Sequence, residues 1–146
     1  MIRQFGTYIT KLFSPPVARR DRLCILIVED SIVFREILKA SLGDGYEVYI
    51  AANARQGWAL HREKSPHIVF MDIGLPKGSG HDLARAIKQD DPSIYVVMAT
   101  GSHDMADKVI AVRNHTDGFL VKPLQMKEIN ACVERYHALR RLRAYN

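Results

Sequence analysis

Five short apolar runs divide this chain, and their pattern restricts it to a small set of folds. Residues 23–28 (LCILIV), 68–71 (IVFM) and 94–98 (IYVVM) are unbroken apolar runs, which is typical of β-strands buried on both faces. Residues 46–51 (YEVYIA) mix apolar and polar side chains and predict a more exposed strand, while the run at 119–121 is brief. Strands buried on both faces indicate a sheet that helices cover on both sides.

The segments between these runs have the spacing of amphipathic helices. The first segment repeats its apolar side chains at intervals of three and four residues, which predicts a helix that starts near Ser31 and stops at Gly43. The five predicted helices fall within residues 31–43, 53–65, 80–91, 105–112 and 125–143. Five strand-then-helix units in series predict an α/β fold, with a five-stranded parallel sheet and five helices on its two faces.

Reactive side chains stand where the predicted strands stop. Glu29 and Asp30 follow the first strand, and Asp72 follows the third. Thr100 and Lys122 follow the fourth and fifth. Because the carboxyl ends of parallel strands share one edge, and ligands bind at that edge, these residues are predicted to form one site.

Length and composition fit a soluble protein with one core. A chain of 146 residues with 47% hydrophobic residues suits a single globular domain. No stretch approaches the roughly 20 apolar residues of a membrane span, and the start of the chain lacks the apolar stretch of a secretory signal, so we expect a cytoplasmic location. Cys24 and Cys132 fall at apolar positions, which predicts buried reduced thiols rather than a disulfide or a metal pair.

The net charge of +5 is carried by the two ends of the chain. Residues 1–22 carry +4 and residues 134–146 carry +3, which leaves −2 on the middle. Nucleic-acid readers concentrate basic residues on a recognition element, and the sequence shows no helix-turn-helix, zinc or RNA-binding motif. We therefore expect no nucleic-acid partner.

The three carboxylates at the shared edge point to metal-assisted phosphoryl transfer. Close carboxylates repel, so one or more takes up a proton unless a cation neutralises them. All-oxygen ligands with few protein groups favour Mg²⁺, or Mn²⁺ in its place. Asp72 would be both ligand and nucleophile, because a carboxylate oxygen can attack phosphorus and form an aspartyl phosphate. Lys122 and Thr100 supply donors to the phosphoryl group, and Gly101 leaves the approach open.

Four motifs in register resemble the receiver domain of two-component response regulators. They are VEDS (28–31), MDIGLPKGSG (71–80), MATG (98–101) and FLVKP (119–123). Any one of them is weak evidence, but four in order are specific, and the resemblance covers about residues 22–137. It implies a flavodoxin-like fold with strand order 2-1-3-4-5. Residues 1–21 are then an N-terminal extension, and 138–146 a basic extension of the last helix.

The resemblance implies roles for the acidic residues. Asp30 matches a direct Mg²⁺ ligand, and Glu29 matches a residue that acts on the metal mainly through water. Asp72 matches the phosphoacceptor. Gly74 matches the position whose backbone carbonyl completes the protein ligands of the metal.

The resemblance also implies how the protein switches. Thr100 matches the switch threonine and Lys122 the phosphate-binding lysine, which Pro123 would follow through a cis peptide bond. On phosphorylation Thr100 moves toward the phosphoryl group, and Phe119 turns into the vacated space. This changes the face made by the fourth helix, fifth strand and fifth helix of the receiver. Phe119 lacks the hydroxyl of the tyrosine often found there, so burial should favour its inward state.

The implied function is that of a stand-alone response regulator. It would receive a phosphoryl group from a histidine kinase or a histidine phosphotransfer protein in a phosphorelay, and it would control the binding of a downstream protein. Phosphorylation and dephosphorylation would be self-catalysed, so the protein would be a signalling phosphoacceptor rather than an enzyme. Homodimerisation is left open.

The sequence departs from the common receiver pattern at a few positions. His67 stands where an aspartate usually follows the proline, and His115 begins a pair that replaces Gly-Ala. Gly74 and Ser102 are small side chains at two positions that tune dephosphorylation, so the phosphoryl lifetime is not predicted. The six histidines show no ligand or catalytic constellation, and we expect surface or capping roles for them.

The two ends carry separate expectations. Residues 2–13 have apolar side chains at near-helical spacing before Ser14-Pro15-Pro16, which predicts a short amphipathic helix and a stiff linker. That helix would dock a partner, mediate dimerisation, lie on a membrane surface or pack on its own domain. The last helix, at residues 125–143, would be about 28 Å long and would exceed the sheet. Its arginines would form a solvated end or a partner-binding handle.

Three other functions fit the sequence less well. A flavin- or nucleotide-binding module would need a phosphate loop after the first strand, where Glu29 and Asp30 place negative charge. A haloacid-dehalogenase-like phosphatase would have a second aspartate at the position of Gly74. A DNA-binding regulator would need more than the 23 residues that follow Pro123.

Overall fold

The computed structural model describes residues 22–101 and 103–146, so the helix and linker expected within residues 1–21 lie outside the described residues. Its strands are β1 (Cys24–Val28), β2 (Glu47–Ala51), β3 (Ile68–Asp72), β4 (Tyr95–Thr100) and β5 (Gly118–Val121). Its α-helices are α2 (Ile32–Leu42), α3 (Ala54–Lys64), α4 (Gly80–Asp90), α5 (Met105–Arg113) and α6 (Met126–Ala144), and a 3-10 turn covers Gly43–Gly45. Each strand is followed by a helix, as predicted.

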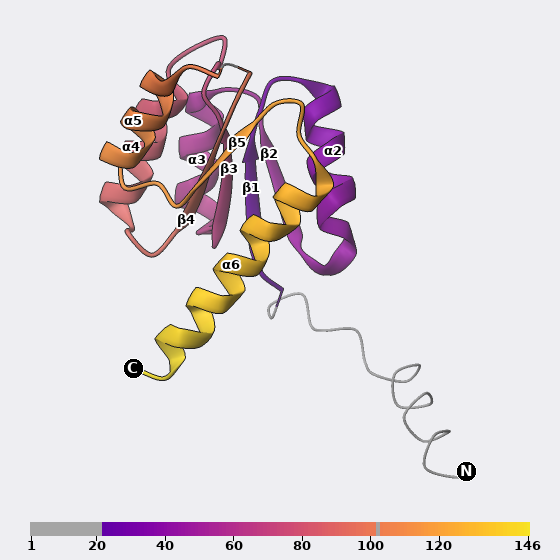
Figure 1. Ribbon diagram of the computed structural model, residues 1–146, viewed down its shortest axis with the longest axis vertical. Coiled ribbons are helices and arrows are strands. Elements are labelled where there is room, and N and C mark those ends of the chain that lie inside the picture. The colour runs from indigo at the N-terminus through magenta and orange to yellow at the C-terminus, as the bar shows by residue number, and fades with distance from the viewer. Residues whose placement is uncertain (1–21, 102) are drawn as a thin grey trace, which may run out of the picture.

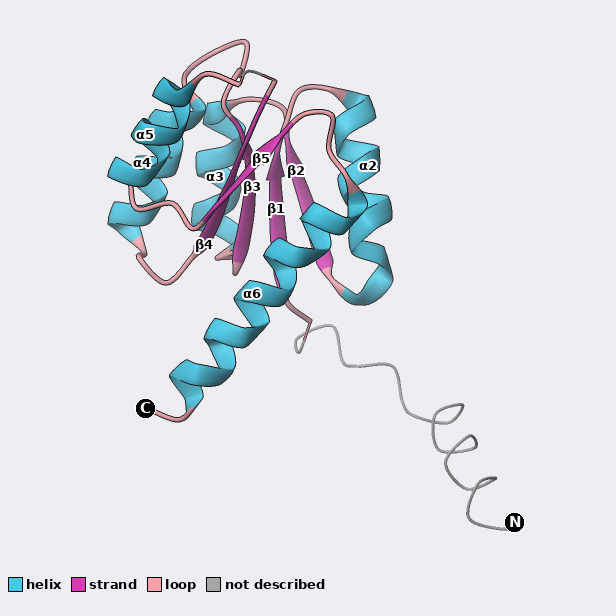
Figure 2. Ribbon diagram, viewed as in Figure 1, coloured by secondary structure: helices cyan, strands magenta, loops and turns pink. Residues whose placement is uncertain are grey.

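The five strands form one parallel sheet with the order β2-β1-β3-β4-β5. All residues of β1, β3 and β4 are buried, while β2 is mostly half-buried. Helices lie on both faces of the sheet (Figure 2). The α/β fold class and the strand order are therefore confirmed.

Two apolar cores separate the sheet from its helices. One core lies under α2 and α6 and includes Leu38 and Ile129, and the other lies under α3, α4 and α5 and includes Leu83 and Ile87. Figure 1 shows the same division, with α2 and α6 on one side of the strands and the other three helices on the opposite side. Alternate residues of the central strands point into the two cores, which is why their sequences are continuously apolar.

The helix ends follow the local signals in the sequence. The Ser31 backbone is extended before α2, and Gly43 ends that helix with a φ of 69°, a conformation that glycine adopts without a steric penalty. The Asn53 side chain accepts a hydrogen bond from the Gln56 backbone N–H and caps α3. Ser65 ends α3 in the left-handed conformation.

Helix α6 is longer than the sheet requires. It runs for 19 residues and reaches past the amino ends of the strands (Figure 1). Leu139 and Leu142 are exposed on this end, and Tyr145 just after it is 90% exposed. Within the described residues, no helix is long and apolar enough to cross a membrane.

The cysteines are as predicted, whereas the histidines are not all on the surface. Cys24 and Cys132 are buried free thiols, and burial raises the pKa of Cys24 to about 11. His61 is only 4% exposed and its Nε2 lies 2.8 Å from Oδ2 of Asp90. The expectation of a surface or capping role is therefore wrong for His61, because its ring is buried and its Nε2 pairs with a carboxylate from α4.

Candidate functional site

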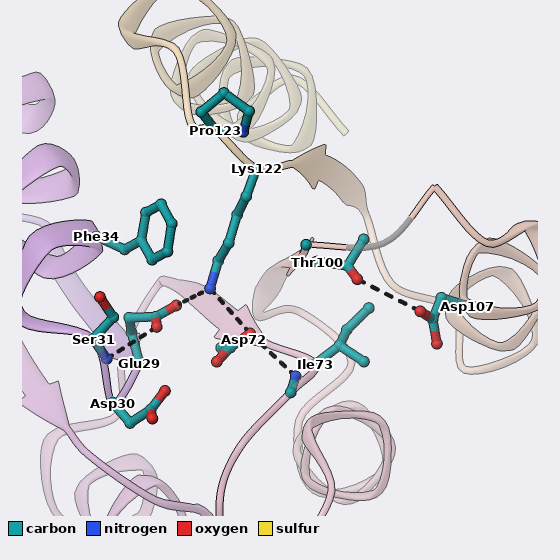
Figure 3. Close-up of a pocket in the computed structure, with 12 residues that line it drawn as sticks. Glu29, Asp30, Ser31, Phe34, Asp72, Ile73, Thr100, Asp107, Lys122 and Pro123 are labelled. Carbon is teal, nitrogen blue, oxygen red and sulfur yellow. Dashed lines mark hydrogen bonds and ion pairs between the residues drawn. The ribbon is translucent and has the colours of Figure 1, made fainter.

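The carboxyl ends of the strands surround a pocket of about 810 Å³. Parallel pairing brings these ends to one edge: Asp72 is in register with Ala99, and Thr100 with Val121. Among the described residues the pocket is lined by Glu29, Asp30, Ser31, Phe34, Asp72, Ile73, Gly74, Thr100, Gly101, Asp107, Lys122 and Pro123. The site residues named from the sequence therefore lie together, with the exception of Phe119 (Figure 3).

Three carboxylates form a compact acidic cluster in this pocket. Glu29, Asp30 and Asp72 each offer an oxygen, and these oxygens lie within 4.8 Å of one another. Glu29 and Asp72 are only 2% and 5% exposed, whereas Asp30 is open to solvent. Oxygen donors of this kind, with one side left to water, are the ligands that Mg²⁺ prefers. The residues present thus fit a divalent metal of the hard, oxygen-binding type.

Lys122 supplies a positive charge to the cluster. Its Nζ lies 2.9 Å from Oε2 of Glu29 and 3.3 Å from Oδ1 of Asp72. The same Nζ lies 4.1 Å from the centre of the Phe34 ring, where the face of an aromatic ring attracts a cation. The Lys122–Pro123 peptide bond is cis, as the receiver resemblance implied. Figure 3 shows the lysine side chain reaching down between the two carboxylates.

Burial keeps Glu29 from ionising as easily as an exposed glutamate. Desolvation raises the pKa of Glu29 above 4.5, and the nearby Asp72 charge raises it further. Hydrogen bonds from Lys122 and from the Ser31 backbone N–H oppose this shift in pKa. A cation bound at the cluster would therefore stabilise the ionised form of Glu29.

The chain after Asp72 turns back over the carboxylate. The Gly74 N–H donates to Oδ1 of Asp72 at 3.1 Å. A Cβ at Gly80, where α4 begins, would lie 2.1 Å from the Asp72 carbonyl oxygen, so only glycine permits this approach. At Gly101 a Cβ would meet nothing within 4 Å, which leaves that wall of the pocket open.

Thr100 lies across the pocket from the lysine. It is 4% exposed at the end of β4, and its Oγ1 donates to Oδ2 of Asp107 at 3.5 Å. Oδ1 of Asp107 in turn lies 3.1 Å from Nε2 of His81, at the start of α4. We call Glu29, Asp30, Asp72 and Lys122 the acidic half of the pocket. We call Thr100 and Asp107, together with His81, which contacts Asp107 from outside the pocket lining, the threonine half.

Four pocket residues were not identified as site residues from the sequence. Ser31 was expected at a helix start, and Phe34 on the apolar face of that helix. Ile73 and Asp107 were not singled out. Helix α5 begins at Met105, between Thr100 and Asp107, and places the Asp107 side chain toward Thr100. An acidic residue seven positions after Thr100, in the first turn of a helix, is therefore the sequence signal that could have identified Asp107.

Phe119 is half-buried and lines a separate cavity of about 290 Å³. The other residues around this cavity come from α5, β5, the loop between them and α6, and include Lys108, Val112 and Arg135. Phe119 therefore lies on the face of the molecule where the receiver resemblance places its output.

The fold and pocket together define the class of this protein. A profile described as response regulator receiver domain matches residues 25–134. The chain belongs to the response regulator receiver family, whose members are signalling phosphoacceptors of two-component systems. Its acidic pocket is the type of site in which receiver domains bind Mg²⁺.

Curated relatives and solved structures agree with this assignment. The chain is 34% identical over 108 residues to the virulence transcriptional regulatory protein PhoP of Salmonella typhimurium. The aligned region covers 73% of this chain and 48% of PhoP. It is 32% identical over 108 residues to the probable transcriptional regulator ycf27 of Cyanophora paradoxa, covering 73% of this chain and 45% of the relative. The chain thus spans less than half the length of these relatives.

Two solved structures show the same fold. A CheY-like response regulator receiver domain protein from Methanospirillum hungatei matches with a TM-score of 0.77 and 26% identity, covering 83% of this chain and 98% of that one. The receiver domain of NtrX from Brucella abortus matches with a TM-score of 0.72 and 30% identity, covering 77% and 96%.

Proposed function

We propose that Asp72 is the phosphoacceptor of this response regulator. The observation that carries the proposal is the arrangement of the acidic half of the pocket. The Asp72 carboxylate is almost fully buried, and Oδ1 of Asp72 lies 3.3 Å from Nζ of Lys122. Oxygens of Asp72, Glu29 and Asp30 lie within 4.8 Å of one another. Phosphoryl transfer depends mainly on positioning and on charge stabilisation. A buried nucleophile between an ammonium group and two further metal-ligand carboxylates meets both needs.

The proposed donor is a phosphohistidine of a histidine kinase or a histidine phosphotransfer protein. An Asp72 carboxylate oxygen attacks phosphorus while the P–N bond breaks, the imidazole leaves with the bonding electron pair, and an acyl phosphate forms on Asp72. Lys122 is placed to neutralise the phosphoryl oxygens, and the Thr100 hydroxyl is placed to donate to them after a rotation. The open wall at Gly101 gives the donor access.

The proposed cofactor is Mg²⁺ or Mn²⁺. Glu29, Asp30, Asp72 and the backbone carbonyl of Gly74 would hold it. When bound, such an ion neutralises the charge on the phosphoryl oxygens. In this arrangement Lys122 balances the buried charge of Glu29 and Asp72.

The proposed output is a change in the face formed by α5, β5 and α6, which controls the binding of a downstream protein in the cytoplasm. Thr100 and Phe119 would be its switch residues. This proposal is supported by the cavity around Phe119, and by the exposed apolar side chains Met105, Val109 and Val112 on α5. Such side chains on one helix suit a protein partner or a second copy of this chain.

Intact mass spectrometry after incubation with acetyl phosphate and Mg²⁺ tests the proposal. The wild type is expected to gain the mass of one phosphoryl group, and Asp72→Asn is expected to gain none. Asp44→Asn, an exposed aspartate outside the pocket, is the matched control and should label like the wild type. Chelation of the metal should prevent labelling. Equal labelling of the wild type and Asp72→Asn would remove Asp72 from the mechanism.

A further inference from the structure

The threonine half of the pocket contains a pair of residues that the phosphoacceptor chemistry does not use. Asp107 stands in the first turn of α5 and His81 in the first turn of α4, and both side chains are largely buried, with 23% and 12% exposed. A hydrogen bond between their side chains joins two helices on the same face of the sheet. Asp107 also accepts a hydrogen bond from the Thr100 hydroxyl, which Figure 3 shows as a dashed line. The pair therefore connects both helices to the end of β4.

His81 is well placed to fix the position of Asp107. Its backbone carbonyl accepts a hydrogen bond from Nδ2 of Asn114 at 3.1 Å, which ties the start of α4 to the end of α5. The preceding residue, Gly80, is pressed against the backbone of Asp72. His81 Nε2 faces a carboxylate oxygen and therefore donates to it. The histidine thus holds Asp107 from a helix start that is itself fixed on the phosphoacceptor strand.

We propose that Asp107, held by His81, is a positioning residue that retains the Thr100 hydroxyl away from Asp72 in the unphosphorylated protein. The inference rests on the proposed function and deepens it, because it assigns a residue pair that regulates the same site. Figure 3 shows the Thr100 side chain turned toward Asp107 and away from the carboxylate of Asp72. Phosphorylation of Asp72 then requires Thr100 to exchange one anionic acceptor for another.

The contact distances suit a bond that is broken during each signalling cycle. The Thr100–Asp107 distance of 3.5 Å is longer than the usual range of O–H···O hydrogen bonds, so the contact is weak. The His81–Asp107 distance of 3.1 Å lies within the usual range of N–H···O hydrogen bonds. Asp107 therefore keeps its contact with His81 at the start of α4 when the Thr100 hydroxyl turns away from it.

The charge of Asp107 adds a second effect in the same direction. Asp107 lines the phosphoryl pocket but is not part of the acidic cluster that could hold a metal. A phosphoryl group brings further negative charge into this pocket, and like charges in a partly buried site repel. Asp107 thus opposes accumulation of the phosphorylated form, both by its charge and by retaining Thr100.

Substitutions at both positions separate these two effects. Affinity for beryllofluoride, a phosphoryl mimic, is measured in the presence of Mg²⁺, and the Thr100 side-chain rotamer is measured by methyl NMR without the mimic. Asp107→Asn removes the charge but keeps an acceptor, and should tighten mimic binding about threefold. Asp107→Ala removes both, and should tighten binding about tenfold and shift the Thr100 rotamer. His81→Leu keeps the charge of Asp107 and should shift the Thr100 rotamer in part.

The controls distinguish failure of this inference from failure of the proposed function. Asp82→Asn removes an exposed charge in the same turn of α4, outside the pocket, and should leave both measurements unchanged. Equal binding by Asp107→Asn and Asp107→Ala, or an unmoved Thr100 rotamer in Asp107→Ala, would overturn the positioning role. If the wild type itself fails to bind the mimic with Mg²⁺, the proposed function fails instead. Thermal unfolding of each variant shows whether it remains folded.

Discussion

The two halves of the pocket are built differently. In the acidic half, Glu29 and Asp72 adjoin strands whose residues are all buried, and both lie within 3.3 Å of Lys122. In the threonine half, Asp107 belongs to α5, where Ala111 is the one buried residue of nine. The half proposed to perform the chemistry is therefore fixed by packing, while the other half is attached to a weakly packed helix. Such a helix can move at a small cost in free energy.

The first prediction applies one substitution to both regions. Val28→Ala, in β1 just before Glu29, removes two methyl groups from a side chain that is 0% exposed, and should lower the free energy of unfolding by about 2.5 kcal/mol. Val112→Ala, in α5, alters a side chain that is 68% exposed, and should change the free energy of unfolding by less than about 0.5 kcal/mol. Urea unfolding of the two variants beside the wild type gives both values. Similar losses of stability would show that α5 is as tightly packed as the strands.

The second prediction concerns the charge of the acidic half. Lys122→Met removes the ammonium group that lies between Glu29 and Asp72, so the cluster becomes more negative and should bind Mg²⁺ about tenfold more tightly. Labelling by acetyl phosphate should fall in the same variant, because the positive charge on the phosphoryl side is lost. Calorimetric titration with Mg²⁺ and intact mass spectrometry measure the two effects.

Tighter Mg²⁺ binding combined with weaker labelling would show that Lys122 competes with the metal for the carboxylates and acts on the phosphoryl group. Lys127→Met, an exposed change at the start of α6, is the control and should alter neither quantity. Weaker Mg²⁺ binding in Lys122→Met would mean that the lysine organises the metal ligands rather than competing with the metal.

The acidic half could be predicted from the sequence because its residues stand at the ends of strands. Glu29 and Asp72 stand at the ends of buried apolar runs and Lys122 follows the shorter, half-buried β5, and the parallel order of the sheet then fixes them at one edge. No knowledge of side-chain contacts was needed. The same argument brought Thr100 into the pocket.

The other two residues of the threonine half could not be predicted in this way. Asp107 and His81 lie in the first turns of helices, and their meeting depends on how α4 and α5 pack against each other, which strand periodicity does not determine. His81, like the other histidines, was expected to have a surface or capping role. Phe34 shows a related limit: its helical spacing predicted a core position correctly, but its ring also contacts the Lys122 ammonium.

The third prediction follows the motion of α5 directly. Addition of beryllofluoride and Mg²⁺ should change amide hydrogen exchange several-fold in α5, because Thr100 leaves Asp107 and weakens the attachment of that helix. Amides in β1 and β3 should change much less, since these strands are buried along their whole length. Mass spectrometry of exchanged peptides resolves the two regions. Equal changes in strands and helix would remove the distinction between the two halves.

The smallest predicted effect is a pH dependence of metal binding in the acidic half. The pKa of Glu29 is raised above its ordinary value of 4.5, chiefly by burial. Between 4.5 and this raised pKa the folded protein binds a proton that the unfolded chain does not, so without metal the Glu29 contribution to stability increases as pH falls through this window. Mg²⁺ competes with that proton, so the rise in melting temperature that Mg²⁺ causes should shrink as pH falls through the same window.

Glu29→Gln isolates this titration, because glutamine keeps the size and the acceptor oxygen of glutamate but does not ionise. The variant should show a smaller Mg²⁺-induced rise in melting temperature at neutral pH, and that rise should change less with pH than in the wild type. Thermal unfolding with and without Mg²⁺, across this pH range, measures both. If the two proteins gave the same pH profile, burial of Glu29 would have no part in setting the affinity of the acidic half for metal.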